Sequence, residues 1–276
     1  MYRRELSHLT AEDKGIKSLE REIKLARKIQ MKLLNGVQPQ INSGEVSGTS
    51  IPARLIGGDY YDFYVLPNGK LRIVIGDVMG KGIPAAMLMI LTRGAFRSAA
   101  ESKQGPGDTI TAMNNAMYTD LRTLGSFVTL FCADWDPENR VLSYANAGHN
   151  TPLVVRANKA ISDLPKVKGV MLGGLPDQNY SERSIKLDEE DVVFFYTDGI
   201  VEAQDCQGNM YKIDRLKDVI LEKSTYDVEA IENEVIKSVE DFVGDVPQKD
   251  DITMVLLKIS QDKTDITSYN SPIINA

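Results

Sequence analysis

Residues 59–77 read DYYDFYVLPNGKLRIVIGD, and this stretch decides the fold. Its two halves, 60–66 and 70–76, are rich in aromatic and branched residues, which favour β-strands. Between them lies Pro-Asn-Gly at 67–69, which is typical of a three-residue hairpin loop: a type I turn and then a glycine in the left-handed conformation. The stretch therefore predicts a β-hairpin.

The register of this hairpin places two carboxylates together. A three-residue loop pairs Leu66 with Lys70, and counting outward along both strands places Asp59 directly opposite Asp77. Their Cβ atoms are then roughly 5 Å apart. A two-residue loop would put them on opposite faces instead. Because facing carboxylates repel each other, either one of them is protonated with a raised pKa or a cation lies between them.

Further aspartates stand at the ends of apolar strands. Asp198 follows the apolar run 192–197, and Asp250 and Asp251 precede the run 252–257. Charged groups beside buried strands are costly unless something compensates them. An aspartate next to a glycine often only caps a turn, which is the simpler reading of each one alone. Several at strand ends, two of them facing each other, favour a metal site.

The composition narrows the chemistry of such a site. The chain has 276 residues and a net charge of −7, which disfavours a general nucleic-acid binder. Two histidines and two cysteines leave oxygen atoms as the ligands, and these suit Mg²⁺ or Mn²⁺. Neither a disulfide framework, a secretory signal nor a membrane-spanning run is indicated, so we expect a cytoplasmic protein with no membrane partner.

The remaining pattern predicts a mixed α+β fold, with antiparallel sheets and long helices packed outside them. We expect a helix N-cap at Asp108 and a core position for Cys132. Strands are predicted at 60–66, 70–76, 127–134, 140–145, 151–156, 184–187, 192–197 and 252–259, and helices at 80–100, 108–122, 212–222 and 228–242.

The N-terminal region predicts an amphipathic helix over 16–34, after a frayed segment at 1–15. It is either a short dimerisation seam or a helix packed on its own domain. We divide the chain into this regulatory or dimerisation helix (1–40), a globular domain (41–260) and a polar, disordered tail (261–276). The apolar seam of the helix is Ile16, Leu19, Ile23, Ala26, Gln30 and Leu33, with Gln30 as a polar position that would set the register.

Several short motifs together resemble those of PPM-type (type 2C) metal-dependent protein phosphatases, in the bacterial SpoIIE/RsbU-like branch. The resemblance extends over roughly residues 45–260, and the order of the motifs makes it specific. The motifs are GGDYYDF at 57–63, GDVMGKG at 76–82, AGHN at 147–150, YTDG at 196–199 and DDIT at 250–253.

The resemblance implies a four-layer α-β-β-α sandwich of two antiparallel sheets, and two Mn²⁺ or Mg²⁺ ions at one end. Asp77 would bridge both ions, Asp59 and the carbonyl of Val78 would bind one ion, and Asp198 and Asp250 the other. Asp59 and Asp77 would be the catalytic pair, since the ions activate a shared water that attacks the substrate phosphorus. Asp250 rather than Asp251 is assigned by its place in the motif.

The resemblance also implies the substrate, a phosphoserine or phosphothreonine on a STAS-domain anti-anti-sigma protein. In this branch such an N-terminal helix often links a sensory domain to the phosphatase, and our hypothesis is that here it either dimerises or receives a separate activating protein. A partner-binding module without turnover and a different oxygen-ligand metal enzyme are the alternatives.

Some residues have two interpretations each. Arg54 is a phosphate ligand or an exposed side chain, and His149 is a general acid or a structural residue. Lys81 and Thr197 are candidates for contact with the substrate or with an outer water of the site, and Glu202 is a candidate to orient the loop after Asp198; the sequence assigns none of these tasks.

Overall fold

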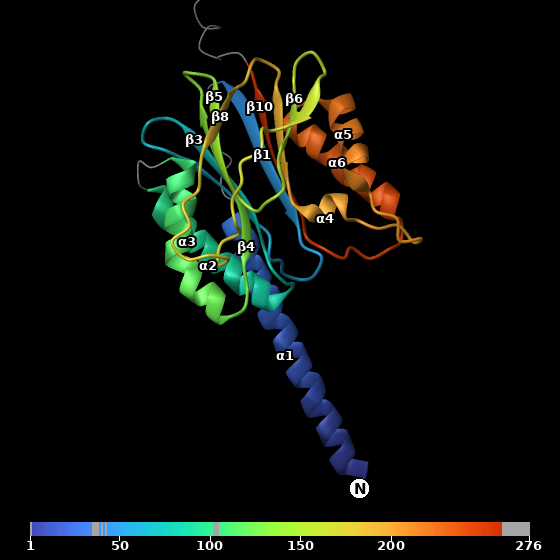
Figure 1. The fold of residues 1–276 in the computed structure, drawn as a ribbon. Coiled ribbons are helices and arrows are strands. Elements are labelled where there is room, and N and C mark those ends of the chain that lie inside the picture. Colours follow the sequence, from blue (N-terminus) through green and yellow to red (C-terminus); the bar gives the residue numbers. More distant parts are fainter. Residues whose placement is uncertain (1, 35–38, 40, 42, 102–104, 261–276) are drawn as a thin grey trace, which may run out of the picture.

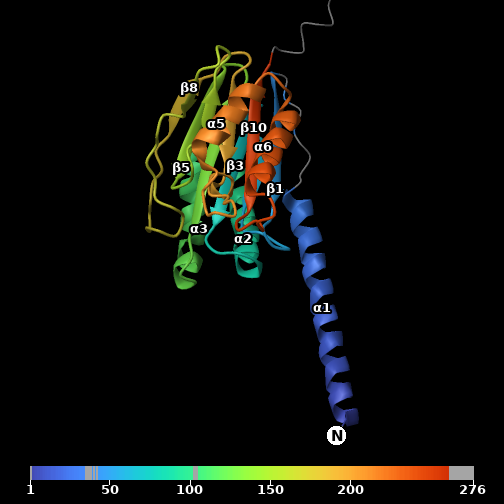
Figure 2. The ribbon, with the colours of Figure 1, turned by 90° about the vertical axis from the view of Figure 1, so that its right-hand side faces the viewer.

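Two antiparallel sheets packed face to face form the centre of the molecule, and helices cover both outer faces (Figures 1 and 2). The structure is a computed structural model and describes residues 2–34, 39, 41, 43–101 and 105–260. The predicted four-layer α-β-β-α sandwich with an N-terminal helix is confirmed. The predicted disordered tail at 261–276 lies outside the described residues.

Each sheet has five strands, and every pairing is antiparallel. The first sheet has the order β1 (Gly44–Ile51), β10 (Ile252–Ile259), β9 (Val192–Tyr196), β6 (Leu153–Val155) and β7 (Ile161–Asp163). The second has the order β2 (Tyr60–Val65), β3 (Leu71–Val78), β4 (Val128–Asp136), β5 (Val141–Ala147) and β8 (Arg183–Lys186).

The helices form the two outer layers. Helices α2 (Ile83–Ala100) and α3 (Pro106–Thr123) cover the second sheet, and α5 (Lys212–Lys223) and α6 (Val228–Val243) cover the first. Between the sheets, the rings of Phe131 and Phe195 meet edge to face with centroids 5.7 Å apart. Cys132, the next residue of β4, is a buried core residue on the other face of its sheet, and its core position is as predicted. Strands β9 and β10 are buried along their whole length because each has a layer on both faces.

The hairpin has the predicted register. The amide of Leu66 donates to the carbonyl of Lys70 at 2.8 Å, and Gly69 has a φ of 81°, so the loop has three residues. Pairing runs from Val65 opposite Leu71 to Tyr60 opposite Gly76. The next pair outward is Asp59 and Asp77.

Local details differ from the sequence predictions. Helix α3 begins with Pro106 after the N-cap Gly105, so Asp108 is not the cap but a residue of the first turn. Proline fits the first helical position because its missing N–H has no intrahelical partner there. Strand β1 has no apolar alternation, since its sequence GEVSGTSI is rich in glycine and serine. Strand β7 and the four-residue helix α4 (Asp198–Val201) were not predicted.

Helix α1 (Tyr2–Leu34) projects away from the sandwich (Figures 1 and 2). The prediction of a frayed segment at 1–15 is wrong, because the helix already begins at Tyr2. Among the side chains of α1 that the structure describes, from residue 15 on, those of Gln30 and Leu34 in the last turns are buried against the domain. Gln30 holds the backbone of Gly57 from both sides: its Nε2 donates to the carbonyl at 2.8 Å, and its Oε1 accepts from the amide at 3.2 Å.

A buried carboxyl joins α6 to β1. Glu232 accepts hydrogen bonds from Ser47 Oγ at 3.0 Å and Thr49 Oγ1 at 2.9 Å. Burial raises the pKa of Glu232 from 4.5 to about 7, the charge of Glu229 adds to this, and the two hydroxyl donors oppose it. The folded state therefore binds a proton at Glu232 more tightly than the unfolded chain does.

This shift predicts a stability that falls as the pH rises. The contribution of Glu232 is complete below pH 4.5 and is lost as the pH rises to about 7. Within that window each pH unit lowers the free energy of unfolding by about 1.4 kcal/mol. Glu232→Gln should remove this slope, as measured by urea unfolding between pH 5 and 8. The control Glu229→Gln, at an exposed position of the same helix, should keep most of it; equal slopes in the parent and Glu232→Gln would contradict the assignment.

Candidate metal centre

The predicted carboxylates meet at one end of the sandwich. Asp59 directly precedes β2, Asp77 is the last residue but one of β3, Asp198 begins α4 after β9, and Asp250 lies just before β10. Residues from both sheets thus meet at a single edge. In the side-chain positions of this structure, no group of three His, Cys, Asp or Glu residues within the described ranges is close enough together to hold a metal ion.

Asp77 lies at the electrostatic centre of this cluster. Its pKa is raised to about 7, first by burial and then by the charges of Asp198 and Asp250, while a hydrogen bond with Asp59 acts in the opposite direction. The pKa of Asp198 is also raised, by burial and by Asp250. Such mutual repulsion is what a bound cation would relieve.

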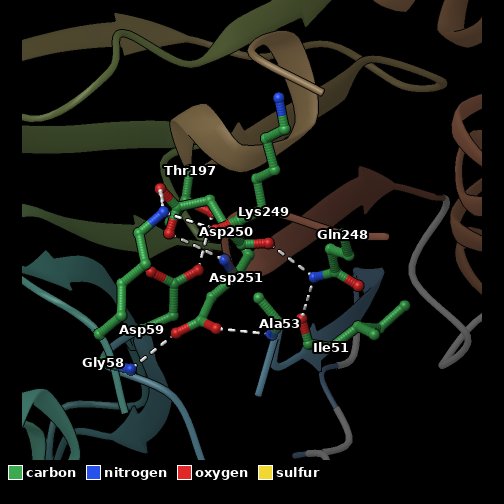
Figure 3. A network of polar contacts seen from close by, with 10 residues as sticks. Ile51, Ala53, Gly58, Asp59, Thr197, Gln248, Lys249, Asp250 and Asp251 are labelled. Atoms are coloured by element: carbon green, nitrogen blue, oxygen red, sulfur yellow. Dashed lines mark hydrogen bonds and ion pairs between the residues drawn. The ribbon is translucent and has the colours of Figure 1, made fainter. Parts of the chain in front are cut away.

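Asp59 is the deepest of these groups, with 3% of its surface exposed. Burial, followed by the charges of Asp77 and Asp251, raises the pKa of Asp59 well above its usual range. The hydroxyl of Thr197 donates to Asp59 Oδ2 at 2.8 Å (Figure 3). It also accepts from the amide of Thr253 at 3.1 Å. Thr197 therefore orients the Asp59 carboxyl from the opposite sheet, which gives this residue a task that the sequence left open.

The neighbours Asp250 and Asp251 point in different directions (Figure 3). Asp251 is buried, and its two oxygens accept from the amides of Ala53 and Gly58, each at 2.7 Å. Both of its oxygens are thus occupied by the backbone before β2. The Asp250 side chain is 40% exposed and lies 2.7 Å from Lys81 Nζ. This arrangement favours Asp250 over Asp251 as a ligand.

Glycines allow these close approaches. A Cβ atom at Gly199 would lie 1.9 Å from the carbonyl oxygen of Asp251, and one at Gly57 would lie 2.4 Å from Asp251 Oδ2. A Cβ atom at Gly58 would lie 3.1 Å from the carbonyl oxygen of Val78, so this carbonyl faces the segment that carries Asp59. The glycines of the motifs make room for neighbouring protein atoms.

The other candidates have different positions. His149 is buried, its Nδ1 lies 2.8 Å from Thr129 Oγ1, and burial lowers its pKa to about 4, which favours a structural role. Arg54 is exposed and follows the end of β1, with its guanidinium beside Gly82. The pKa of Glu202 is raised by partial burial and by Asp198 and Asp250, so Glu202 lies at the rim of the cluster.

Two contacts near the site were not anticipated. Asp62, the second acid of GGDYYDF, is buried and faces away from the cluster: it forms a two-pronged ion pair with Arg97 of α2, with Arg97 Nε 2.7 Å from Asp62 Oδ2. Gln30 of α1 holds Gly57, two residues before Asp59. The strand alternation gives the direction of Asp62, since residues 59 and 62 point to opposite faces. The local sequence around Gln30 does not indicate that its side chain binds the backbone of Gly57.

The donor set fits hard divalent cations. It consists of carboxylates and one backbone carbonyl, and no described His or Cys belongs to it. Mg²⁺ keeps several waters and needs only one or two carboxylates from the protein, whereas a closed cage would need more. An open set of carboxylates, of which Asp59, Asp77 and Asp198 have raised pKa values, therefore suits Mg²⁺ or Mn²⁺.

Comparison with known sequences identifies the family. The family described as stage II sporulation protein E (SpoIIE) matches residues 67–260, more than half of the chain. The chain belongs to the SpoIIE family. Among its relatives is the phosphoserine phosphatase RsbU of Bacillus subtilis, with 28% identity over 87% of this chain and 70% of RsbU.

The part of each relative that this chain matches differs in size. Protein IcfG of Synechocystis has 29% identity over 85% of this chain, and the phosphoserine phosphatase RsbP of Bacillus subtilis has 24% over 72%. The matched regions make up 41% of IcfG and 49% of RsbP, so the shared part is embedded in longer proteins there. The resemblance expected from the motifs is confirmed.

Solved structures share the fold. The SiaA-PP2C domain of Pseudomonas aeruginosa superposes with a TM-score of 0.76 at 20% identity, covering 88% of this chain and 98% of that domain. The RsbU and RsbW domains of a Mycobacterium tuberculosis protein give 0.69 at 22%, covering 80% and 61%. RsbX in complex with magnesium gives a TM-score of 0.61 at 17% identity, covering 81% of this chain and 98% of RsbX.

None of the helices in the described ranges is long and apolar enough for a membrane crossing.

The different environments of the neighbours Asp250 and Asp251 predict that their substitution changes the stability of the protein differently. Asp251→Asn points an amide donor at one of two buried N–H groups and should cost about 1–3 kcal/mol of stability. Asp250→Asn removes a charge that repels Asp77 and Asp198, so the metal-free protein should keep or gain stability. Thermal unfolding in chelator measures both. Equal losses in the two variants would contradict this division.

Proposed function

We propose that this protein is a metal-dependent phosphatase that hydrolyses phosphoserine or phosphothreonine on a protein. The observation that carries the proposal is the pair Asp59 and Asp77, which the hairpin brings together. Asp59 is buried, Asp77 is half-buried, and the charges of Asp198 and Asp250 repel Asp77. Membership of the SpoIIE family and the similarity to two phosphoserine phosphatases support it.

In this proposal Asp77 bridges two Mg²⁺ or Mn²⁺ ions, Asp59 and the Val78 carbonyl hold one ion, and Asp198 and Asp250 hold the other. When bound, such ions activate water for attack on phosphorus and neutralise charge on the phosphoryl oxygens. The protein fixes the carboxylates: Thr197 orients Asp59, and Asp251 anchors the segment that carries it. Cys132 has no part, because burial in the core raises the pKa of its thiol far above its usual range.

The substrate in this proposal is a phosphorylated STAS-domain anti-anti-sigma protein, so that dephosphorylation changes sigma-factor activity in the cytoplasm. The similarity to RsbU and RsbP, which are phosphoserine phosphatases, supports the phosphoserine. The similarity to the RsbU and RsbW domains of a Mycobacterium tuberculosis protein agrees with a signalling role. The STAS domain itself rests on the resemblance to distant relatives.

Helix α1 is the proposed place of regulation, through a second copy or an activating protein. Ile16 and Leu19 of the predicted seam are each more than half exposed in the single chain, as is Ile29. Exposed apolar side chains along a projecting helix favour a partner helix. Gln30 connects the base of this helix to Gly57, next to the segment that carries Asp59.

The catalytic proposal predicts a loss of activity when the bridging ligand is changed. The parent should release phosphate from a phosphoserine STAS-domain protein with Mn²⁺ and not with chelator. Asp77→Asn should lower kcat by about a hundredfold or more, since the shared metal ligand is weakened. Asp108→Asn, at an exposed position of α3, is the matched control and should retain activity.

The alternatives correspond to distinct results of this assay. If Asp77→Asn hydrolyses the substrate like the parent, the carboxylate cluster is not the active site. If the folded parent releases no phosphate with Mn²⁺ but binds the phosphoprotein tightly, the chain is a partner-binding module without turnover.

The regulatory proposal predicts an effect of removing the projecting part of α1. Deletion of residues 1–24 leaves Gln30 and Leu34 on the domain, so the sandwich should remain folded. We expect the deleted protein to lose self-association, as measured by light scattering, or to lose its response to an activating protein. An unchanged oligomeric state together with unchanged activity would rule out a regulatory α1.

A further inference from the structure

A cavity of about 410 Å³ opens directly beside the carboxylate cluster. It lies between the segment after α4, the C-terminal end of α6 and the loop 244–250 that leads into β10. Lys81, Gly199 and Asp250 are among its lining residues. The cavity therefore adjoins the candidate metal centre at Asp250.

Part of the cavity wall is apolar. Val239 and Ile252 are almost completely buried, and Val243 and Val246 are half-buried. Pro247 and Ala203 complete this wall. A wall of small branched side chains stabilises an apolar group that leaves water, roughly in proportion to the area it buries.

Polar contacts hold the walls in place. Gln248 Nε2 donates to the carbonyls of Ile51 at 2.8 Å and Asp250 at 2.6 Å, which ties the loop to the end of β1 (Figure 3). Lys249 Nζ donates to Gln204 Oε1 at 2.6 Å and so joins the loop to the segment after α4. The cavity is thus formed before any ligand arrives, which lowers the entropic cost of binding.

We propose that this cavity is a subsite for an apolar side chain that flanks the phosphoserine of the protein substrate. The inference rests on the proposed phosphatase function and assigns part of its substrate specificity to Val243, Val246 and their neighbours. A phosphoserine directed to Asp77 and Asp250 brings the flanking residues of its own chain to the mouth of the cavity. An extended chain advances roughly 3.3–3.6 Å per residue, so the occupant lies within about three positions of the phosphoserine.

The charges at the rim favour this occupant over an anion. Glu202, Glu240 and Asp250 line the cavity together with Lys81 and Lys249, and Lys81 is already paired with Asp250. No excess of positive charge therefore remains at the rim for a second phosphate. The apolar wall favours a side chain such as leucine or methionine, while the cations that we propose at the acidic cluster would bind the phosphoryl group beside it.

The test compares peptides with a small substrate. Each phosphoserine peptide carries leucine, glycine or aspartate at one of the three positions before or after the phosphoserine. The kcat/KM for its hydrolysis with Mn²⁺ is measured alongside that for para-nitrophenyl phosphate. At one position leucine should raise kcat/KM about tenfold or more over glycine, and aspartate should lower it. Val246→Trp and Val243→Trp fill the cavity and should reduce this preference to within about twofold, with para-nitrophenyl phosphate hydrolysed as by the parent.

The control is Val65→Trp, at an exposed position of β2 away from the cavity, which should keep the preference. Val246 lies in a loop, so its substitution tests the cavity even if Val243→Trp in the last turn of α6 does not fold. Hydrolysis of the peptides by the parent without an apolar preference, or a preference that survives Val246→Trp, would overturn the subsite and leave the phosphatase intact. A parent that hydrolyses neither peptides nor para-nitrophenyl phosphate with Mn²⁺ would overturn the phosphatase function and the subsite together.

Discussion

The repulsion between Asp59 and Asp77 is the constraint on which the rest of the site depends. The hairpin places the two carboxyls opposite each other, and burial between the sheets raises the pKa of both. Packed strands cannot move apart to relieve this repulsion, because their register is fixed by the turn and by the buried faces. A hydrogen bond between the two carboxyls offsets this repulsion in part, and in our proposal bound cations relieve the rest.

The surrounding residues keep this arrangement in place from both sheets. Thr197, at the end of β9, donates to Asp59, and Asp251, at the start of β10, accepts from the amides on either side of the loop before β2. A second layer of hydrogen bonds of this kind orients the groups that would contact a metal. The site is consequently a property of the interface between the two sheets.

Neighbouring aspartates perform opposite tasks in this interface. Asp251 is a structural residue that holds the backbone, while Asp250 faces the cluster and the adjoining cavity. Asp62, three residues after Asp59, binds Arg97 and fastens β2 to α2. The acidic motifs of this chain thus contain scaffold residues, Asp62 and Asp251, beside the residues that we propose as metal ligands, and only the direction of the side chain distinguishes them.

The sequence alone determined the hairpin, its register and the meeting of Asp59 with Asp77, because a turn and a strand period of two are local properties. It also determined the layered fold, since apolar strands and amphipathic helices must bury their faces against one another. The partners of Gln30, Asp251 and Glu232, the buried polar strand β1 and the cavity beside Asp250 were decided only by the tertiary structure. Each of these depends on contacts between segments far apart in the chain, and no local pattern encodes which distant backbone group will face a given side chain.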